Sequence, residues 1–143
     1  HCNLARSFWV GEPPAAAAEL HQKSIQAFEI VEGMLAPGMA VRPLLEAVAR
    51  HYEEAGIRDE AYWSGGYEMG IAFPPDWVGA FIYDLTMTGE QEIFAPMTAV
   101  NHECNFYAPD SLGMSVTIET FLFHEDRAVI ASAFPRDLQA LCL

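Results

Sequence analysis

Apolar residues recur at helical spacing in two stretches near the start of the chain. In the first stretch they form one stripe, and a run of alanines adds helix propensity. A break at 36–39 separates the two stretches, and the second starts near Pro43 and stops before Gly56. The stripes consist of Ile25, Phe28, Val31 and Leu35, and of Leu45, Val48, Ala49 and Tyr52. The pattern therefore predicts helices over 15–35 and 43–55.

Beyond Gly56 the pattern changes to short apolar runs bounded by glycine and proline, which is typical of strands. The runs that we expect to be strands, including one before the helices, are 2–10, 65–73, 97–104, 114–123 and 128–134. Residues 78–94 show no clear pattern and predict a loop with a short strand around 80–83. The strands over 97–104 and 114–123 can pair as antiparallel neighbours, and 134–138 reads as a terminal turn. A strand, two helices and then several strands predict an α+β fold.

Amino-acid composition and net charge limit the class of protein, its partners and its compartment. The chain has 143 residues, 52% apolar and 19% charged, which fits one globular domain. Its formal net charge of −13 would repel phosphate backbones and anionic membrane surfaces, so we expect no nucleic acid and no membrane as partners. No signal peptide is visible, and the odd set Cys2, Cys104 and Cys142 fits a reducing compartment. These features predict a cytoplasmic protein, and an opening that reads like mid-strand predicts a fragment cut upstream.

No standard local motif for phosphate binding, nucleophilic catalysis or metal binding is present. The five histidines are scattered, without metal-ligand spacing. His21 and His51 fall on the predicted helices, and we expect both to be solvated.

Glu119 stands out because it lies inside an apolar predicted strand, on the face of Phe121 and Phe123. Such a carboxylate must be paired, bound to a cation or left at a half-exposed surface. Glu103 lies on the preceding strand, and His102 beside it points to the opposite face, so only one of these two can share a site with Glu119. Two carboxylates on adjacent strands could bind a divalent cation or act as a general acid/base pair.

Glycines at 65, 66 and 70 indicate either a close approach of the backbone to another group or simply a bulge or turn. The aromatic and proline cluster at 73–77 could form the wall of a pocket, or could cover an edge of the core.

Six segments, in chain order, resemble the C-terminal part of the pita-bread metallopeptidase family, which includes aminopeptidase P, prolidase, methionine aminopeptidase and the metal-independent creatinase. The segments are His1–Ser7 with Val10–Gly11, Ala36–Met39, Gly66–Ile71, Ala95–Met97, Thr117–Thr120 and Phe134–Leu138. The first two segments resemble the family's Asp-x-x-Arg-Thr strand and its Pro-Gly-Met helix link. The next two resemble its Gly-His-Gly-x-Gly segment and the Pro-Gly-Met before the next strand. The last two resemble the strand with a ligand Glu and the usual family ending. The resemblance implies one partial domain over 1–143, a curved antiparallel sheet covered by helices, with the N-terminal part of the fold missing.

The resemblance also implies a site for two divalent cations (manganese, cobalt or zinc) held by two Asp, one His and two Glu. The first Asp would precede the chain, the second falls on Asn3, and the His falls on Tyr67. The first Glu position falls on His102, with Glu103 one residue further, and only Glu119 matches outright. Because hard cations need several well-placed oxygens, these departures imply that ordinary dinuclear binding is lost.

The opening HCNLAR and the segment GYEMGIAFPPDW resemble most the branch of creatinase and the ectoine-hydrolase-like proteins, some of which cleave C–N bonds without metal. The resemblance implies a hydrolase acting on an Xaa-Pro dipeptide or a small amidine or amide-like compound. Glu119 and Glu103 would be catalytic, and Tyr67, His102 and Asn3 would bind substrate. The chain departs even from this branch, because a common family His falls on Trp63.

Two other interpretations stay open at this point. One is a non-catalytic relative that keeps the fold as a binding or dimerisation module, and the other is an acidic α+β domain of a different kind. Family analogy also implies a homodimer.

Overall fold

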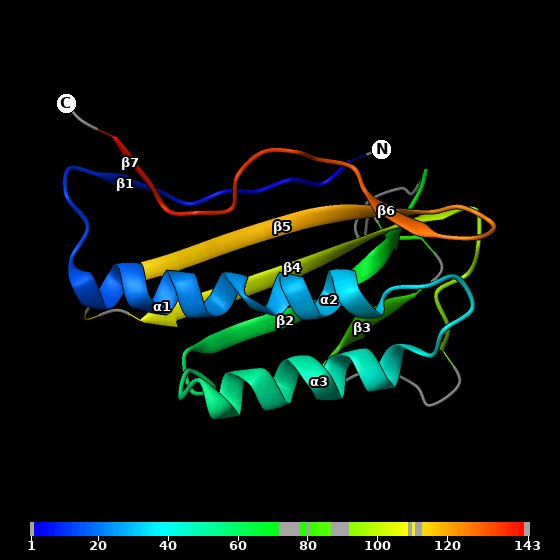
Figure 1. Ribbon diagram of the computed structural model, residues 1–143, viewed down its shortest axis with the longest axis horizontal. Coiled ribbons are helices and arrows are strands. Elements are labelled where there is room, and N and C mark those ends of the chain that lie inside the picture. The colour runs from blue at the N-terminus through cyan, green and yellow to red at the C-terminus, as the bar shows by residue number, and fades with distance from the viewer. Residues whose placement is uncertain are drawn as a thin grey trace.

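The computed structural model describes residues 2–71, 78–79, 81–86, 92–108, 110 and 113–141. Its helices are α1 (Ala15–Ile25), α2 (Ala27–Met34) and α3 (Val41–Glu54). Its strands are β1 (Phe8–Val10), β2 (Ala61–Met69), β3 (Ile82–Asp84), β4 (Thr98–Ala108), β5 (Gly113–Phe123), β6 (Ala128–Ile130) and β7 (Gln139–Leu141). The predicted α+β class is confirmed, with helices before most of the strands (Figure 1).

Five strands form a curved antiparallel sheet in the order β3-β2-β4-β5-β6. The predicted pairing of the two long strands is confirmed, because β4 and β5 pair over eleven positions from Thr98↔Phe123 to Ala108↔Gly113. The segment before β1 continues the edge of β5, where Ala5 and Ile118 exchange backbone hydrogen bonds of 3.3 and 3.2 Å. The described chain thus places its first residues beside β5.

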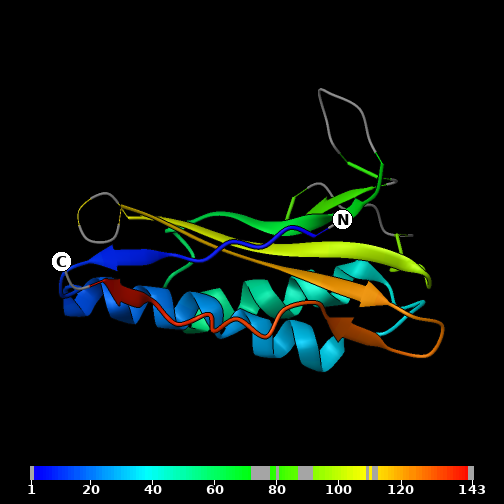
Figure 2. The same cartoon turned by 90° about the horizontal axis from the view of Figure 1, so that it is seen from above.

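The three helices cover one face of the sheet, and the other face carries no helix among the described residues (Figure 2). The apolar stripes that predicted the helices point to the sheet, because Phe28, Val31, Val48 and Tyr52 are fully buried. They pack against alternate residues of β4 and β5, including Phe106 and Phe121, in one core. The predicted helix over 15–35 is interrupted at Gln26, which separates α1 from α2.

Several predicted boundaries were wrong at short elements. The first and last predicted strands shrink to β1 and β6, three residues each, and the terminal turn is followed by β7. β1 and β7 form a separate parallel pair, with Trp9 opposite Ala140. This pair of strands brings the two ends of the described chain together, and no local sequence pattern predicts it.

The predicted solvation of two histidines was wrong. His21 is buried, with Nδ1 2.8 Å from Ser115 Oγ and Nε2 2.9 Å from the Arg136 carbonyl. His51 is half-buried, with Nε2 2.8 Å from the Lys23 carbonyl. Because each buried ring finds partners, its polar atoms do not oppose burial.

The glycines of β2 do mark a close backbone approach. A Cβ atom on Gly66 would lie 1.8 Å from the Asn101 carbonyl oxygen, which is far inside van der Waals contact. The predicted aromatic wall at 73–77 lies outside the described residues. In the described part of the chain, no helix is both long enough and apolar enough to cross a membrane.

Candidate functional site

The register of β4 and β5 separates the two predicted catalytic carboxylates. His102 stands directly opposite Glu119, whereas Glu103 stands opposite Ile118. Directly paired residues share a face, and neighbours along a strand alternate, so His102 and Glu119 face the helices and Glu103 faces the other side. The structure therefore does not bring Glu103 and Glu119 together, and the residue that shares a face with Glu119 is His102.

Glu103 is the centre of a polar cluster on the helix-free face. Its Oε1 accepts hydrogen bonds from Asn101 Nδ2 at 2.7 Å and Asn3 Nδ2 at 3.3 Å, and its Oε2 accepts one from Asn105 Nδ2 at 3.1 Å. Asn3 Nδ2 also donates to the Tyr67 hydroxyl at 2.8 Å. We call these five residues the Glu103 cluster, and it unites three of the predicted site residues, Asn3, Tyr67 and Glu103.

The cluster is held by backbone on three sides. Asn3 N–H donates to Thr120 Oγ1 at 2.8 Å, and the same hydroxyl donates back to the Asn3 carbonyl at 2.8 Å. The Tyr67 N–H donates to Asn101 Oδ1 at 2.7 Å. Strands β2, β4 and β5 thus fix the Asn and Tyr side chains around the carboxylate.

The surroundings of Glu103 raise the pKa of its carboxyl group. Partial burial raises the pKa of Glu103, and the amide hydrogen bonds from Asn105 and Asn101 oppose that rise. Burial and the nearby Glu103 charge raise the pKa of Tyr67, so its hydroxyl keeps its proton. Because Asn3 donates to the Tyr67 oxygen, the phenolic proton is available to a further acceptor. The cluster thus combines a proton acceptor with a hydrogen-bond donor.

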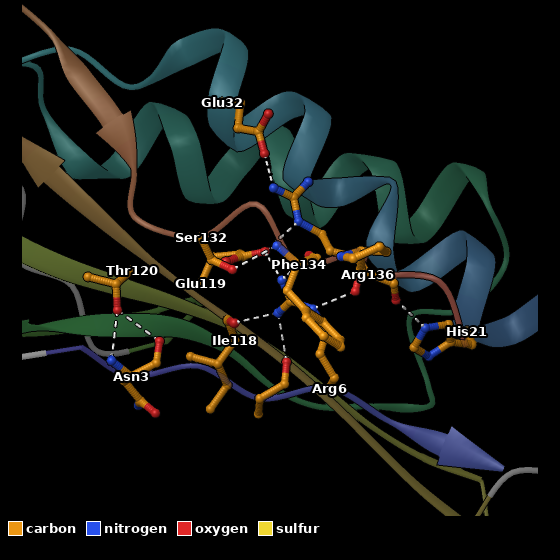
Figure 3. Close-up of polar contacts among 12 residues, drawn as sticks. Asn3, Arg6, His21, Glu32, Ile118, Glu119, Thr120, Ser132, Phe134 and Arg136 are labelled. Carbon is orange, nitrogen blue, oxygen red and sulfur yellow. Dashed lines mark hydrogen bonds and ion pairs between the residues drawn. The ribbon is translucent and has the colours of Figure 1, made fainter. Parts of the chain in front are cut away.

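Glu119 has different surroundings on the helix side. Its Oε1 atom accepts from Arg6, and from Arg136 at 2.9 Å, and Arg136 also pairs with Glu32 of α2 (Figure 3). The Arg6 side chain is nearly buried. It also donates hydrogen bonds to four backbone carbonyls, those of Ala5, Ile118, Phe134 and Pro135. Of the choices open to a buried carboxylate, the structure shows the ion pair.

The arginine side of this network reaches a groove of about 360 Å³ between α1, α2 and residues 130–137. Arg136 lines it, with its guanidinium 4.8 Å from the centre of the Phe28 ring. Since Arg6 and Arg136 together balance the charges of Glu32 and Glu119, this network adds little net charge to the groove.

His102 lies within the core and not at an accessible face. Its ring stacks on Tyr83 and meets Phe28 edge-on, and its Nδ1 is 3.3 Å from the Tyr83 hydroxyl. Complete burial lowers the pKa of His102 to about 3, so the ring is neutral.

A dinuclear metal centre does not fit the residues of the Glu103 cluster. The cluster offers one carboxylate, and both its oxygens accept hydrogen bonds from amide NH₂ groups. Two divalent cations need several carboxylate or imidazole ligands. Across the described ranges, no group of three or more His, Cys, Asp or Glu residues could hold a metal ion.

The curved antiparallel sheet with helices on one face matches the pita-bread fold. The family comparison is more specific: the chain belongs to metallopeptidase family M24, whose model matches residues 1–125. Members of this family normally use two divalent metals, so the Glu103 cluster departs from the family's usual donor set. No curated protein matches the chain.

Solved structures support the fold at low identity. The chain is similar to a dipeptidase from Pyrococcus horikoshii OT3 (TM-score 0.83, 16% identity, 98% of this chain and 37% of that one). It is similar to an X-Pro aminopeptidase from Thermotoga maritima MSB8 (0.81, 16%, 96% and 37%) and to the prolidase from Pyrococcus furiosus (0.75, 20%, 94% and 38%). The chain therefore spans little more than a third of the length of these proteins.

Two asparagines of the cluster, Asn101 and Asn105, and both arginines were not predicted from the sequence. The alternation Asn101-x-Glu103-x-Asn105 is visible in the sequence and could have indicated one polar strand face. Arg6 and Arg136 come from segments far apart in the chain, and only the fold brings them to Glu119.

Proposed function

We propose that this chain forms the substrate-facing part of a hydrolase that cleaves a C–N bond without a dinuclear metal centre. The substrate is an Xaa-Pro dipeptide, or a small amide-like or amidine compound of the kind cleaved in the creatinase-like branch. The observation that carries the proposal is the Glu103 cluster, a half-buried carboxylate beside a protonated phenol on the helix-free face. We also propose that the protein is a homodimer and is located in the cytoplasm.

In this mechanism Glu103 acts first as a general base and then as a general acid. Its carboxylate takes a proton from water as the water oxygen bonds to the carbonyl or amidine carbon. The C–N bond then breaks, and the same carboxyl group returns its proton to the leaving nitrogen. A carboxyl with a raised pKa suits both steps, since it holds a proton more readily than an exposed glutamate.

Tyr67 and Asn3 would orient the substrate and stabilise the developing charge. The free phenolic proton of Tyr67 can donate to the oxygen on which negative charge collects. Asn3 holds both the phenol and the carboxylate, so it fixes the spacing between donor and base. Glu119 and His102 take no step here, because both are buried on the other face of the sheet.

The alternative is a non-catalytic pita-bread homologue that acts as a binding or dimerisation module. It is favoured by the arginine pairing of Glu119, a structural use of the one residue that matches a family ligand. Under this alternative the Glu103 cluster would be a satisfied polar face with no role in turnover.

Assays of the full-length protein on Xaa-Pro dipeptides and on small amides and amidines separate the two. We expect hydrolysis of one class, a loss of about 10²–10⁴-fold in kcat in Glu103→Gln, and about 10²–10³-fold in Tyr67→Phe. The control is Glu125→Gln, an exposed carboxylate that should leave activity unchanged. Turnover that is indifferent to Glu103→Gln would contradict the mechanism, and no turnover at all would favour the module.

A further inference from the structure

Three buried polar atoms on the helix-facing side of β4 and β5 have no hydrogen-bond partner in the described part of the chain. They are His102 Nε2, Thr117 Oγ1 and Glu119 Oε2. The three residues are 0%, 0% and 1% exposed, respectively. A fourth such atom, Asn105 Oδ1, belongs to the opposite face of β4. Buried polar atoms without a partner are rare in folded proteins, so three together require a physical explanation.

The register places these three residues next to one another. His102 and Glu119 are directly paired across β4 and β5, and Thr117 precedes Glu119 by two residues on the same face. Side chains in such positions have Cβ atoms about 4.5–5.5 Å apart when directly opposed and about 7–8 Å apart on the diagonal. The Phe28 ring of α2 contacts both His102 and Arg136, the partner of Glu119, so α2 covers this end of the group.

The chemistry of the three atoms is complementary to one small molecule. The hydroxyl of Thr117 can donate a hydrogen bond. His102 Nε2 is an acceptor when the neutral ring carries its proton on Nδ1, toward the Tyr83 hydroxyl, which itself donates to the Asn101 carbonyl. Glu119 Oε2 is an acceptor in the arginine-paired carboxylate. A ligand with two donors and one acceptor at hydrogen-bond spacing satisfies all three.

We propose that His102, Thr117 and Glu119 form a binding site for one internal water molecule between the sheet and α2. Water donates to His102 Nε2 and Glu119 Oε2 and accepts from Thr117, which is within the usual two to four contacts of a buried water. A metal cation fits less well, because Arg6 and Arg136 already neutralise the same carboxylate. The site lies on the opposite face from the Glu103 cluster, so the inference does not depend on the proposed function.

A crystal structure of the full-length protein at about 1.5 Å tests this, because hydrogen-bond distances of about 2.7–3.2 Å identify a water. We expect one isolated peak within that range of all three atoms, with no anomalous signal. An anomalous peak would instead indicate a metal ion. Either a metal ion or a direct His102–Glu119 hydrogen bond without a peak would overturn the proposal.

Two variants provide a second readout in solution. Thr117→Val removes the only donor to the water while keeping the side-chain shape, and we expect its Tm to fall by roughly 3–5 °C. The matched control is Thr98→Val at the start of β4, whose hydroxyl already donates directly to the Ala95 carbonyl at 2.7 Å. In Thr117→Val crystals the peak should disappear or lose occupancy, and an unchanged peak would contradict the assignment of Thr117.

Discussion

Glu103 and Glu119 project from opposite faces of one sheet, although they stand on neighbouring strands only one register position apart. Glu103 meets three asparagine amides on the helix-free face, and Glu119 meets two arginines beneath the helices. Two similar carboxylates therefore have different surroundings: Glu103 accepts hydrogen bonds from amides on the face where we propose proton transfer, and Glu119 ties distant segments to the sheet through its arginines.

Substituting Glu103 should change how stability depends on pH. Burial raises its pKa in the folded protein, so the folded state keeps this proton where the unfolded chain has already lost it. The contribution of the protonated carboxyl is present at low pH and is lost as pH rises from about 4.3 through the folded pKa. We expect Glu103→Gln to become more stable relative to wild type across that window, measured by urea unfolding at several pH values. Parallel profiles, as expected for the control Glu125→Gln, would contradict the raised pKa.

Removing Arg6 should destabilise the fold strongly. Its side chain is 3% exposed and pairs with Glu119, whose side chain is 1% exposed, so Arg6→Met leaves Glu119 with Arg136 alone. Breaking a buried pair from one side costs about 3–5 kcal/mol in the free energy of unfolding. The matched change Arg127→Met removes an exposed pair with Asp126 and should cost about 0–0.5 kcal/mol. A loss below about 1 kcal/mol in Arg6→Met would show that Arg136 suffices.

His102 should make the protein sensitive to mild acid. Because its folded pKa is about 3 and its unfolded pKa is near 6.5, the unfolded chain binds the extra proton between these values. Stability is therefore highest above about pH 6.5 and falls by up to about 1.4 kcal/mol per pH unit below it. His21, whose pKa is also lowered by burial, acts in the same direction.

Unfolding of His102→Gln measured between pH 4 and 7 tests this contribution. We expect a flatter pH dependence than in wild type, since the buried titrating ring is gone. His124→Gln, at an exposed position after β5, should keep the wild-type slope. A slope unchanged in His102→Gln would mean that other groups dominate acid unfolding.

The glycines of the chain should respond oppositely to alanine. A Cβ on Gly66 would collide with the Asn101 carbonyl, so Gly66→Ala should cost about 2–4 kcal/mol by forcing β2 away from β4. Gly33 in α2 has nothing within 4 Å of its Cβ position, and Gly33→Ala should add about 0.5–1 kcal/mol through helix propensity. Denaturation midpoints in urea compare the two, and a neutral Gly66→Ala would contradict the close approach.

Local pattern was sufficient to predict the main elements. The stripe through Phe28 and Val31 predicted a helix, and the alternation in 114–123 predicted β5 and its antiparallel pairing with β4. These patterns repeat over several helical turns or residue pairs, so a single exceptional residue does not hide them. The three-residue strands β1 and β7 have no such repeat, and they form through contacts between the two ends of the chain.

The candidate site could be predicted only in part, because its geometry depends on register. Alternation alone showed that His102 and Glu103 face opposite sides, but which of them joins Glu119 depends on how β4 and β5 align. Asn3 and Tyr67 reach Glu103 from 100 and 36 positions away in the sequence, a proximity that only the fold creates. The burial of His21 was not predicted for the same reason, because its partners Ser115 and Arg136 lie 94 and 115 positions away in the sequence.

We propose that Glu103, and not a dinuclear metal centre, performs the proton transfers of C–N hydrolysis. The most direct measurement is kcat of the full-length protein on its best substrate before and after exhaustive chelation, with the metal content determined on the same samples. We expect activity to be unchanged by chelation and lost in Glu103→Gln. Activity abolished by chelation and restored by manganese, cobalt or zinc would contradict it.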